Sequence, residues 1–129
     1  MSKKAFRRAS ALAGALQRAT HLRVVIPTLT VLMAPLDSKI WTQVALDVLL
    51  PVVGGATLLH GEGRWLDSSG ALTSEPVTML ECYLSRRPSM TACFAVVSEL
   101  AVLATRMGQE ALFVVVDGRP FLIPGVDVR

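Results

Sequence analysis

The residues best suited to a chemical role lie between Gly54 and Glu75, in the stretch GGATLLHGEGRWLDSSGALTSE. This stretch has glycines at positions 54, 55, 61 and 63, followed by Trp65, and it ends in Glu75. Glycine lets the backbone approach a ligand or another backbone without a Cβ in the way, but it weakens any strand that it occupies. Core packing alone does not require this spacing, so we expect the function to lie here.

Several common kinds of catalytic site are absent from the sequence. No serine, cysteine or threonine stands in a nucleophile elbow, there is no Walker loop, and no carboxylate cluster has metal-ligand spacing. The GGAT and GEG segments do not open a predicted helix, so they lack the free amides and the dipole of a phosphate site. Cys82 and Cys93 lie far from both histidines and are expected to be free core thiols. We therefore expect no metal, no cofactor and no hydrolysis by these catalysts.

The composition indicates one domain that associates with other copies. The chain has 129 residues, of which 52% are apolar, and its mean hydropathy is +0.51. No apolar run reaches the roughly 20 residues that cross a bilayer. Apolar surface in excess of what a small domain can bury, without a membrane span, favours burial between subunits. We expect a homo-oligomer.

The positive charge is concentrated at the N-terminus. Residues 1–23 hold six basic groups and no acidic group, whereas the remainder holds seven basic and ten acidic groups. We interpret residues 1–20 as a basic extension, helical or disordered, that lies outside a domain formed by residues 21–129. Such an extension could dock on an acidic surface of a neighbouring subunit or on another anionic partner, and a targeting role stays open. Nucleic-acid binding is expected only through this extension, and the location is expected to be cytoplasmic.

The periodicity of the remaining chain predicts alternating strands and helices. The order is strand, helix, strand, strand, helix, strand, which is the pattern of an α+β, ferredoxin-like domain whose helices cover one face of an antiparallel sheet. The open face then needs a partner, which other copies of the chain would supply. Pro27 suggests an edge position or a bulge for the first strand, and Pro51 is expected to end the first helix. The predicted strands are 21–33, 56–66, 76–85, 110–116 and a short 119–123, the helices are 38–50 and 89–107, and residues 67–70 form a hairpin turn.

Five positions in this framework resemble a known family: Gly63, Trp65, Gly70, Glu75 and Gln109. With the strand EALFVVV after Gln109, they look like the S-adenosylmethionine (SAM) lyases encoded by phages, which are small trimeric proteins with a ferredoxin-like fold akin to PII signalling proteins. They are also similar to an uncharacterised bacterial family that shares a G-x-W, a glycine turn and a following glutamate. The likeness runs from the first predicted strand to the fourth.

The resemblance implies a lyase that gives methylthioadenosine and homoserine lactone, with SAM as substrate and no cofactor. Glu75 matches the acidic position at the start of the third strand, where it would hold the substrate's ammonium group. Trp65 stands where those lyases have a tyrosine, so it keeps an aromatic face for the sulfonium but lacks the hydroxyl. Gln109 would contact the adenine or the ribose. The resemblance implies a homotrimer with clefts between subunits formed by residues 57–75, and the substrate-binding positions would include Thr57, Gly61, Gly63 and Arg64.

Other functions fit the same residues. The chain could be a PII-like small-ligand sensor without catalysis, a possibility that the missing tyrosine at position 65 favours. It could also be a structural protein that assembles through its basic extension, in which case deleting residues 1–20 would abolish assembly and leave the domain folded. At the level of residues, Glu75 could instead pair with Arg64 or Arg87. Trp65 could be a subunit-interface aromatic, and Gln109 could only cap the preceding helix.

Overall fold

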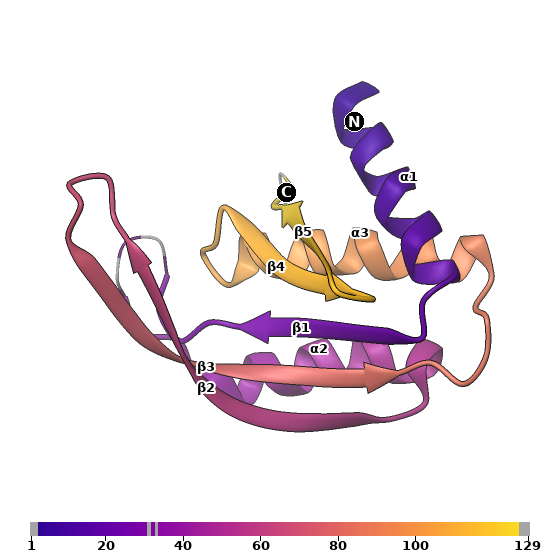
Figure 1. The fold of residues 1–129 in the computed structure, drawn as a ribbon, viewed down its shortest axis with the longest axis horizontal. Helices are drawn as coiled ribbons and strands as arrows, with labels where there is room; N and C mark the ends of the chain where they lie inside the picture. The colour runs from indigo at the N-terminus through magenta and orange to yellow at the C-terminus, as the bar shows by residue number, and fades with distance from the viewer. Residues whose placement is uncertain (1–2, 31, 33, 127–129) are drawn as a thin grey trace.

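The computed structural model describes residues 3–30, 32 and 34–126 (Figure 1). The described part contains the predicted series of strands and helices, with one helix before it and one strand after it. In chain order the elements are α1 (Lys3–Gln17), β1 (His21–Ile26), α2 (Ser38–Val53), β2 (Ala56–Leu66), β3 (Leu72–Tyr83), α3 (Met90–Arg106), β4 (Ala111–Val116) and β5 (Arg119–Pro124).

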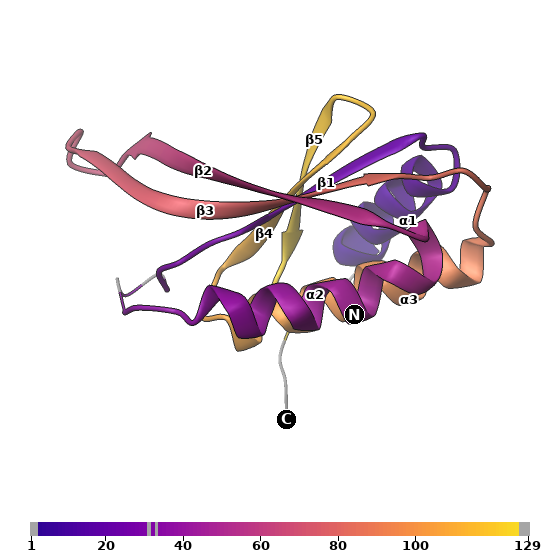
Figure 2. The ribbon, with the colours of Figure 1, turned by 90° about the horizontal axis from the view of Figure 1, so that it is seen from below.

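The strands form one antiparallel sheet in the order β2-β3-β1-β4-β5. Helices α2 and α3 lie side by side on one face of this sheet (Figure 2). This arrangement is the ferredoxin-like α+β fold that the sequence predicted, with β5 added beside β4. Strand β1 lies between β3 and β4 at the centre of the sheet, so the predicted edge position for β1 is wrong.

The largest differences between predicted and observed strand boundaries lie near prolines. Strand β1 ends at Ile26 instead of continuing to residue 33, since Pro27 has no N–H to continue the ladder. Of the predicted 21–33 strand, residues 31 and 33 lie outside the described part. Strand β3 begins at Leu72 and includes Pro76, where the sequence predicted its start. Glu75 therefore lies within β3 and not at its beginning.

Helix α2 passes through the proline that was expected to end it. Asp37 caps its first turn. The helix runs on to Val53 and ends at Gly54, which has a φ of +81°. Pro51 lies in the last turn, and the burial of Leu49 and Val53 favours continuation of the helix over a break.

The core lies between the sheet and the helices. Inward residues of neighbouring strands face one another, as when Val24 of β1 pairs with Leu80 of β3 and Val114 of β4, and all three are buried. Cys82 and Cys93 are free and buried in this core, as predicted. Burial raises the pKa of the Cys82 thiol to about 11 and also raises that of Cys93, so both stay protonated at neutral pH.

The N-terminal segment is helical, but it does not lie outside the main fold. The second half of α1 packs on α3, where Leu12 and Leu16 are buried in the same core as the sheet residues. Phe6 stacks on Phe94 of α3, with 6.2 Å between ring centroids. The expected separate extension is thus corrected for this part of α1, because its apolar stripe covers a surface of α3 that the sheet leaves free. No helix in the described part is long and apolar enough to cross a membrane.

The sheet face opposite the helices stays uncovered in the single chain. Large apolar side chains on this face remain partly exposed, with Leu122 at 65% and Tyr83 at 71%. Phe113 lies directly across from Leu122 in the register, and Leu59 lies on the same face of β2. This is the surface that the composition led us to expect a partner to cover.

Candidate functional site

The far end of the β2–β3 hairpin projects beyond the rest of the sheet (Figure 1). Strand β1 pairs with β3 only as far as Thr78, so residues 72–77 pair with β2 alone. At the tip, the Asp67 carboxylate accepts hydrogen bonds from Ser69 Oγ at 2.6 Å and from the backbone N–H of Ala71 at 3.0 Å. The pKa of Asp67 is lowered by these bonds, the one from Ser69 first. With Gly70 at φ +84°, this is the predicted turn.

Trp65 and Glu75 lie on the same face of this hairpin. Gly63 is the cross-strand partner of Glu75, and strand alternation places residues 63, 65 and 75 on one side. The indole lies over Gly63, where a Cβ would come within 3.2 Å of Trp65 Cζ3. The opening expected at this glycine is therefore filled by the indole, which is itself 42% exposed. At Gly61 the tip of Met79 lies over the backbone in the same way.

Glu75 has a buried side chain in which one carboxylate oxygen accepts hydrogen bonds and the other has no partner among the described residues. Its side chain is on the uncovered face, yet the residue is only 7% exposed. Oε2 accepts from the backbone N–H and from the hydroxyl of Thr28, both at 3.2 Å. Oε1 has no hydrogen-bond partner among the described residues, and it is not fully buried. Neither Arg64 nor Arg87 pairs with Glu75 in this part of the chain, and Thr28 takes the place expected for them.

Gln109 is tied to the residue next to Thr28. Its Nε2 donates to the carbonyl oxygen of Leu29 at 2.6 Å and to that of Met107 at 3.2 Å, which uses both amide protons. Gly108, which precedes Gln109 and has a φ of +65°, allows the chain to pack closely here, because a Cβ at this position would lie 2.9 Å from the Thr30 methyl. The two-residue segment Thr28–Leu29 thus contacts both Glu75 of β3 and Gln109, which follows α3. Gln109 contributes to the end of α3 through Met107, but its shorter bond is to Leu29.

Two other predicted residues lie apart from this group. Arg64 faces the other side of the hairpin, where its Nη2 lies 3.3 Å from Glu62 Oε2 in an exposed pair. Thr57 is opposite Glu81, and Glu81 is six residues from Glu75 along β3, which is roughly 20 Å of strand. One small ligand cannot touch both Thr57 and Glu75 of the same chain.

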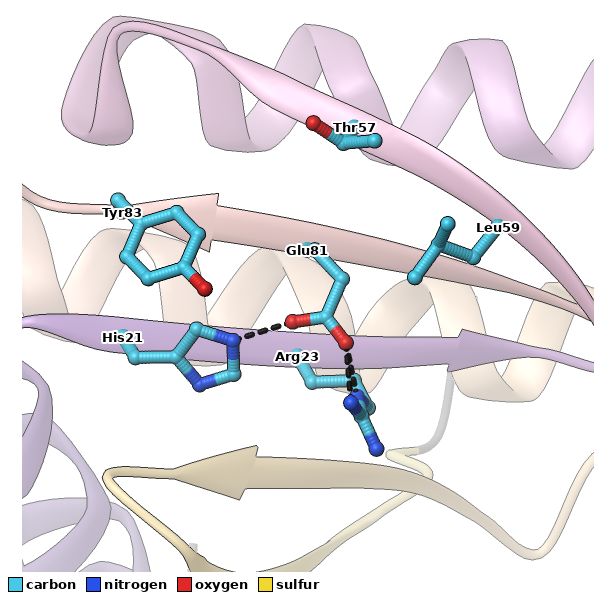
Figure 3. A pocket seen from close by; sticks show the side chains of 6 residues that line it. All are labelled: His21, Arg23, Thr57, Leu59, Glu81 and Tyr83. Carbon is cyan, nitrogen blue, oxygen red and sulfur yellow. Dashed lines mark hydrogen bonds and ion pairs between the residues drawn. The ribbon is translucent and has the colours of Figure 1, made fainter.

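Thr57 instead lines a shallow hollow of about 570 Å³ on the uncovered sheet face. Figure 3 shows the Glu81 carboxylate between the side chains of two β1 residues, His21 and Arg23. His21 Nε2 donates to Oε2 and Arg23 Nε donates to Oε1. The hollow is lined by His21, Arg23, Thr57, Leu59, Glu81 and Tyr83.

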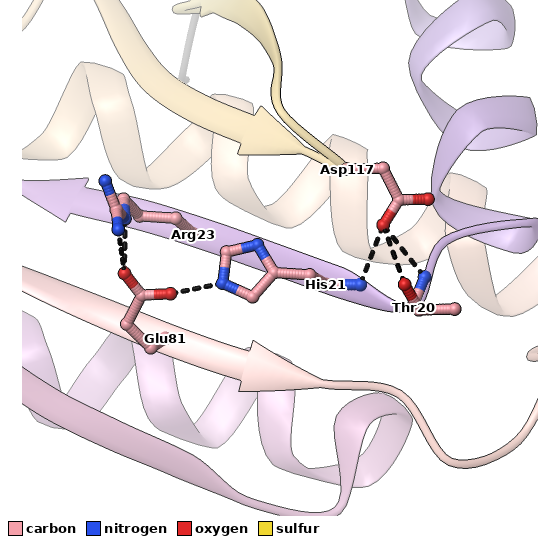
Figure 4. A network of polar contacts seen from close by, with 5 residues as sticks. All are labelled: Thr20, His21, Arg23, Glu81 and Asp117. Atoms are coloured by element: carbon pink, nitrogen blue, oxygen red, sulfur yellow. Dashed lines mark hydrogen bonds and ion pairs between the residues drawn. The ribbon is translucent and has the colours of Figure 1, made fainter.

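The groups around Glu81 form a polar network that continues to the β4–β5 turn. Burial raises the pKa of Glu81, but the hydrogen bonds and charges of His21 and Arg23 outweigh this effect and hold the pKa below its ordinary value. Figure 4 shows Asp117 accepting from the backbone N–H groups of Thr20 and His21, at 3.0 and 2.9 Å. These bonds lower the pKa of Asp117 and fix the junction between α1 and β1. Both carboxylate oxygens of Glu81 are paired, and the visible role of the network is to hold the sheet together.

No metal centre is formed by the described residues. Across 3–30, 32 and 34–126, no three His, Cys, Asp or Glu side chains are grouped so that they could hold a metal ion. On one face of the hairpin, the structure places the Glu75 carboxylate and the Trp65 indole, two groups suited to a ligand. This arrangement can bind a cationic group, because a carboxylate and an aromatic face both attract positive charge.

Sequence reasoning missed Thr28, Leu29 and the Glu81 network. Only the register between β1 and β3 brings Thr28 to Glu75, and a single sequence does not give that register. The network left a weak signal, since polar residues alternate with buried ones at His21 and Arg23 of β1. In β3, Glu81 likewise stands between the apolar residues Leu80 and Cys82 in the sequence.

The fold is similar to two solved structures of a phage SAM lyase. The structure in complex with S-methyl-5'-thioadenosine has 13% sequence identity and a TM-score of 0.59, covering 84% of this chain and 92% of the other. The apo structure has 14% identity and a TM-score of 0.57, covering 84% of this chain and 91% of the other. No protein-family model matches the sequence, and none of the curated proteins matches it significantly. The resemblance to phage SAM lyases drawn from the sequence is confirmed at the level of the fold.

Proposed function

We propose that the protein is a SAM lyase that converts SAM into methylthioadenosine and homoserine lactone. The proposal rests above all on the buried carboxylate of Glu75, which lies on the same hairpin face as Trp65 and whose Oε1 has no hydrogen-bond partner among the described residues. The fold shared with the phage lyase supports it. A cytoplasmic location, in a bacterial or phage-infected cell, is part of the same proposal.

The reaction needs no nucleophile from the protein. A carboxylate oxygen of the substrate attacks its own γ-carbon, the bond from that carbon to sulfur breaks, and the electron pair neutralises the sulfonium. The lactone forms and the thioether leaves without water or a proton transfer. Since a negative and a positive charge vanish together, a site that orients the chain and excludes water favours the transition state.

Each residue of the group has a role that its chemistry allows. Glu75 Oε1 would accept hydrogen bonds from the substrate ammonium, and the indole of Trp65 would face the sulfonium. Gln109 has spent both amide protons on backbone carbonyls, so its Oε1 is the atom left to accept a bond from the adenine amino group or the ribose. Gly63 would allow the indole to lie flat on the strand.

We further propose that the cleft is completed by other copies of the chain, as a homotrimer. The uncovered sheet face, with its exposed apolar residues, supplies a surface for association. Thr57 could join the site only from a second subunit, because it lies too far from Glu75 within one chain. Arg64, on the opposite side of the hairpin, could likewise reach a ligand held by a neighbouring copy.

The test is to incubate the purified protein with SAM and follow methylthioadenosine by chromatography. We expect product from the wild type and a loss of at least roughly a hundredfold in turnover for Glu75→Gln, since the ammonium loses a charged partner. Glu62→Gln is a matched control, because Glu62 is an exposed hairpin carboxylate on the other side. The absence of product from the wild type, or equal rates for wild type and Glu75→Gln, would refute the proposal.

One observation favours a second function, that of a PII-like sensor that binds a ligand without turnover. The chain has a single tyrosine, Tyr83, and it lies eight residues beyond Glu75 on β3, so no phenol of this chain can stand beside Glu75. Thermal stabilisation by SAM or an adenine nucleotide without any product would indicate the sensor.

A further inference from the structure

We propose that Thr28 is the positioning residue of the site, holding Oε2 of Glu75 so that Oε1 is presented to the substrate ammonium. This inference rests on the proposed function. Its evidence is the pair of 3.2 Å contacts from the Thr28 N–H and hydroxyl to the same carboxylate oxygen. Two donors on one oxygen fix the rotation of the carboxylate and direct the other oxygen away from Thr28.

The position of Thr28 is itself set by its neighbours. Its hydroxyl lies 2.8 Å from the carbonyl oxygen of Pro76, the residue after Glu75, so a single proton is shared between the two acceptors. Its own carbonyl accepts from the N–H of Leu36 at 2.8 Å. Because Pro27 ends the pairing of β1, Thr28 is freed from the sheet ladder to make these contacts.

The same segment couples both ends of the proposed substrate. Leu29, next to Thr28, accepts the short bond from Gln109, which we assign to the adenine or ribose. A shift of Thr28 would therefore move Glu75 and Gln109 together, whereas removal of the Thr28 hydroxyl alone would act on Glu75 and on the Pro76 carbonyl beside it but not on Gln109. This difference allows positioning to be distinguished from a general structural role.

The contrast between substrate and product makes the inference testable. SAM carries the ammonium group and methylthioadenosine does not, so only SAM reports on the orientation of Glu75. Thr28→Val keeps the branched shape and the N–H but removes the hydroxyl, and Thr28→Ser restores it. We expect Thr28→Val to raise the KM for SAM about three- to tenfold with kcat changed less than about twofold, from the loss of one hydrogen bond to a charged group. Binding of methylthioadenosine, measured by calorimetry, should be unchanged, and Thr28→Ser should retain the wild-type KM.

Each outcome decides the matter. An equal loss of affinity for SAM and methylthioadenosine in Thr28→Val, or a wild-type KM for SAM, overturns the positioning role while leaving the lyase proposal intact. Failure of the wild type to bind or cleave SAM overturns both. If Thr28→Val does not fold, the comparison is made between Thr28→Ala and Thr28→Ser, and equal affinities for SAM in these two variants overturn the role.

Discussion

Glu75 and Trp65 are held to different degrees by their surroundings. Glu75 is 7% exposed and its orientation is set by Thr28, whereas Trp65 is 42% exposed and rests on the flat surface of Gly63. A fixed carboxylate beside a more exposed indole suits a ligand that is anchored at its charged end before its aromatic contacts form. The indole is therefore the part of the group whose role is easiest to alter without disturbing the fold.

Replacing Trp65 with leucine should weaken binding of the sulfonium substrate. A cation–π contact is worth about 0.5–2 kcal/mol, so we expect a loss of that size for SAM, measured by calorimetry. The neutral thioether of methylthioadenosine serves as the control ligand and should lose less. Trp65→Tyr should keep SAM binding and raise turnover if a phenol at this position assists the reaction. Equal losses for both ligands in Trp65→Leu would show that the indole acts through packing alone.

Among the elements, those with strong local signals could be predicted and those determined by tertiary contacts could not. Strand β2 and the turn at Gly70 follow from β-propensity and turn residues, and both boundaries of β2 were predicted correctly. Helix α2 continued past Pro51 because burial of Val53 outweighed a local preference. Of the residues in the proposed site, Glu75, Trp65 and Gln109 were named from the sequence, whereas the contact of Thr28 depends on the register of β1.

The docking of α1 leads to a prediction about stability. Leu16 is 2% exposed in the shared core, so Leu16→Ala should lower the free energy of unfolding by about 2–5 kcal/mol. Lys4→Glu, on the exposed part of the same helix, should change it by less than about 0.5 kcal/mol. Chemical denaturation followed by circular dichroism measures both.

The same packing changes how the basic segment can be tested. Deletion of residues 1–20 would remove core residues of α1 and destabilise the domain, contrary to the expectation that it leaves the domain folded. Charge reversal at Lys4 or Arg8 tests the role of the positive charge without removing core residues, because both side chains are exposed. If Leu16→Ala unfolds like the wild type, α1 is not part of the core.

At the scale of the whole molecule, the two faces of the sheet are unequal. One face is covered by α2 and α3, while the other exposes apolar residues around the charged Glu81 network (Figures 2 and 3). Covering such a sheet face with a second copy of the chain would lower the free energy, because apolar surface is removed from contact with water. The paired network fits such a surface, since buried charges are tolerated when each has its partner.

Leu122→Glu should therefore disrupt assembly, because it places a charge on the apolar part of this uncovered face formed by β4 and β5, where Leu122 is 65% exposed in the single chain. We expect the wild type to sediment as a homotrimer and Leu122→Glu as a monomer with an unchanged circular dichroism spectrum. Ile40→Glu is the matched control, since Ile40 is 57% exposed on α2, away from that face, and should leave the trimer intact. If the clefts lie between subunits, Leu122→Glu must also lose SAM binding although every residue around Glu75 is unchanged. A monomeric wild type, or a Leu122→Glu variant with full assembly, would show that this face is not the interface.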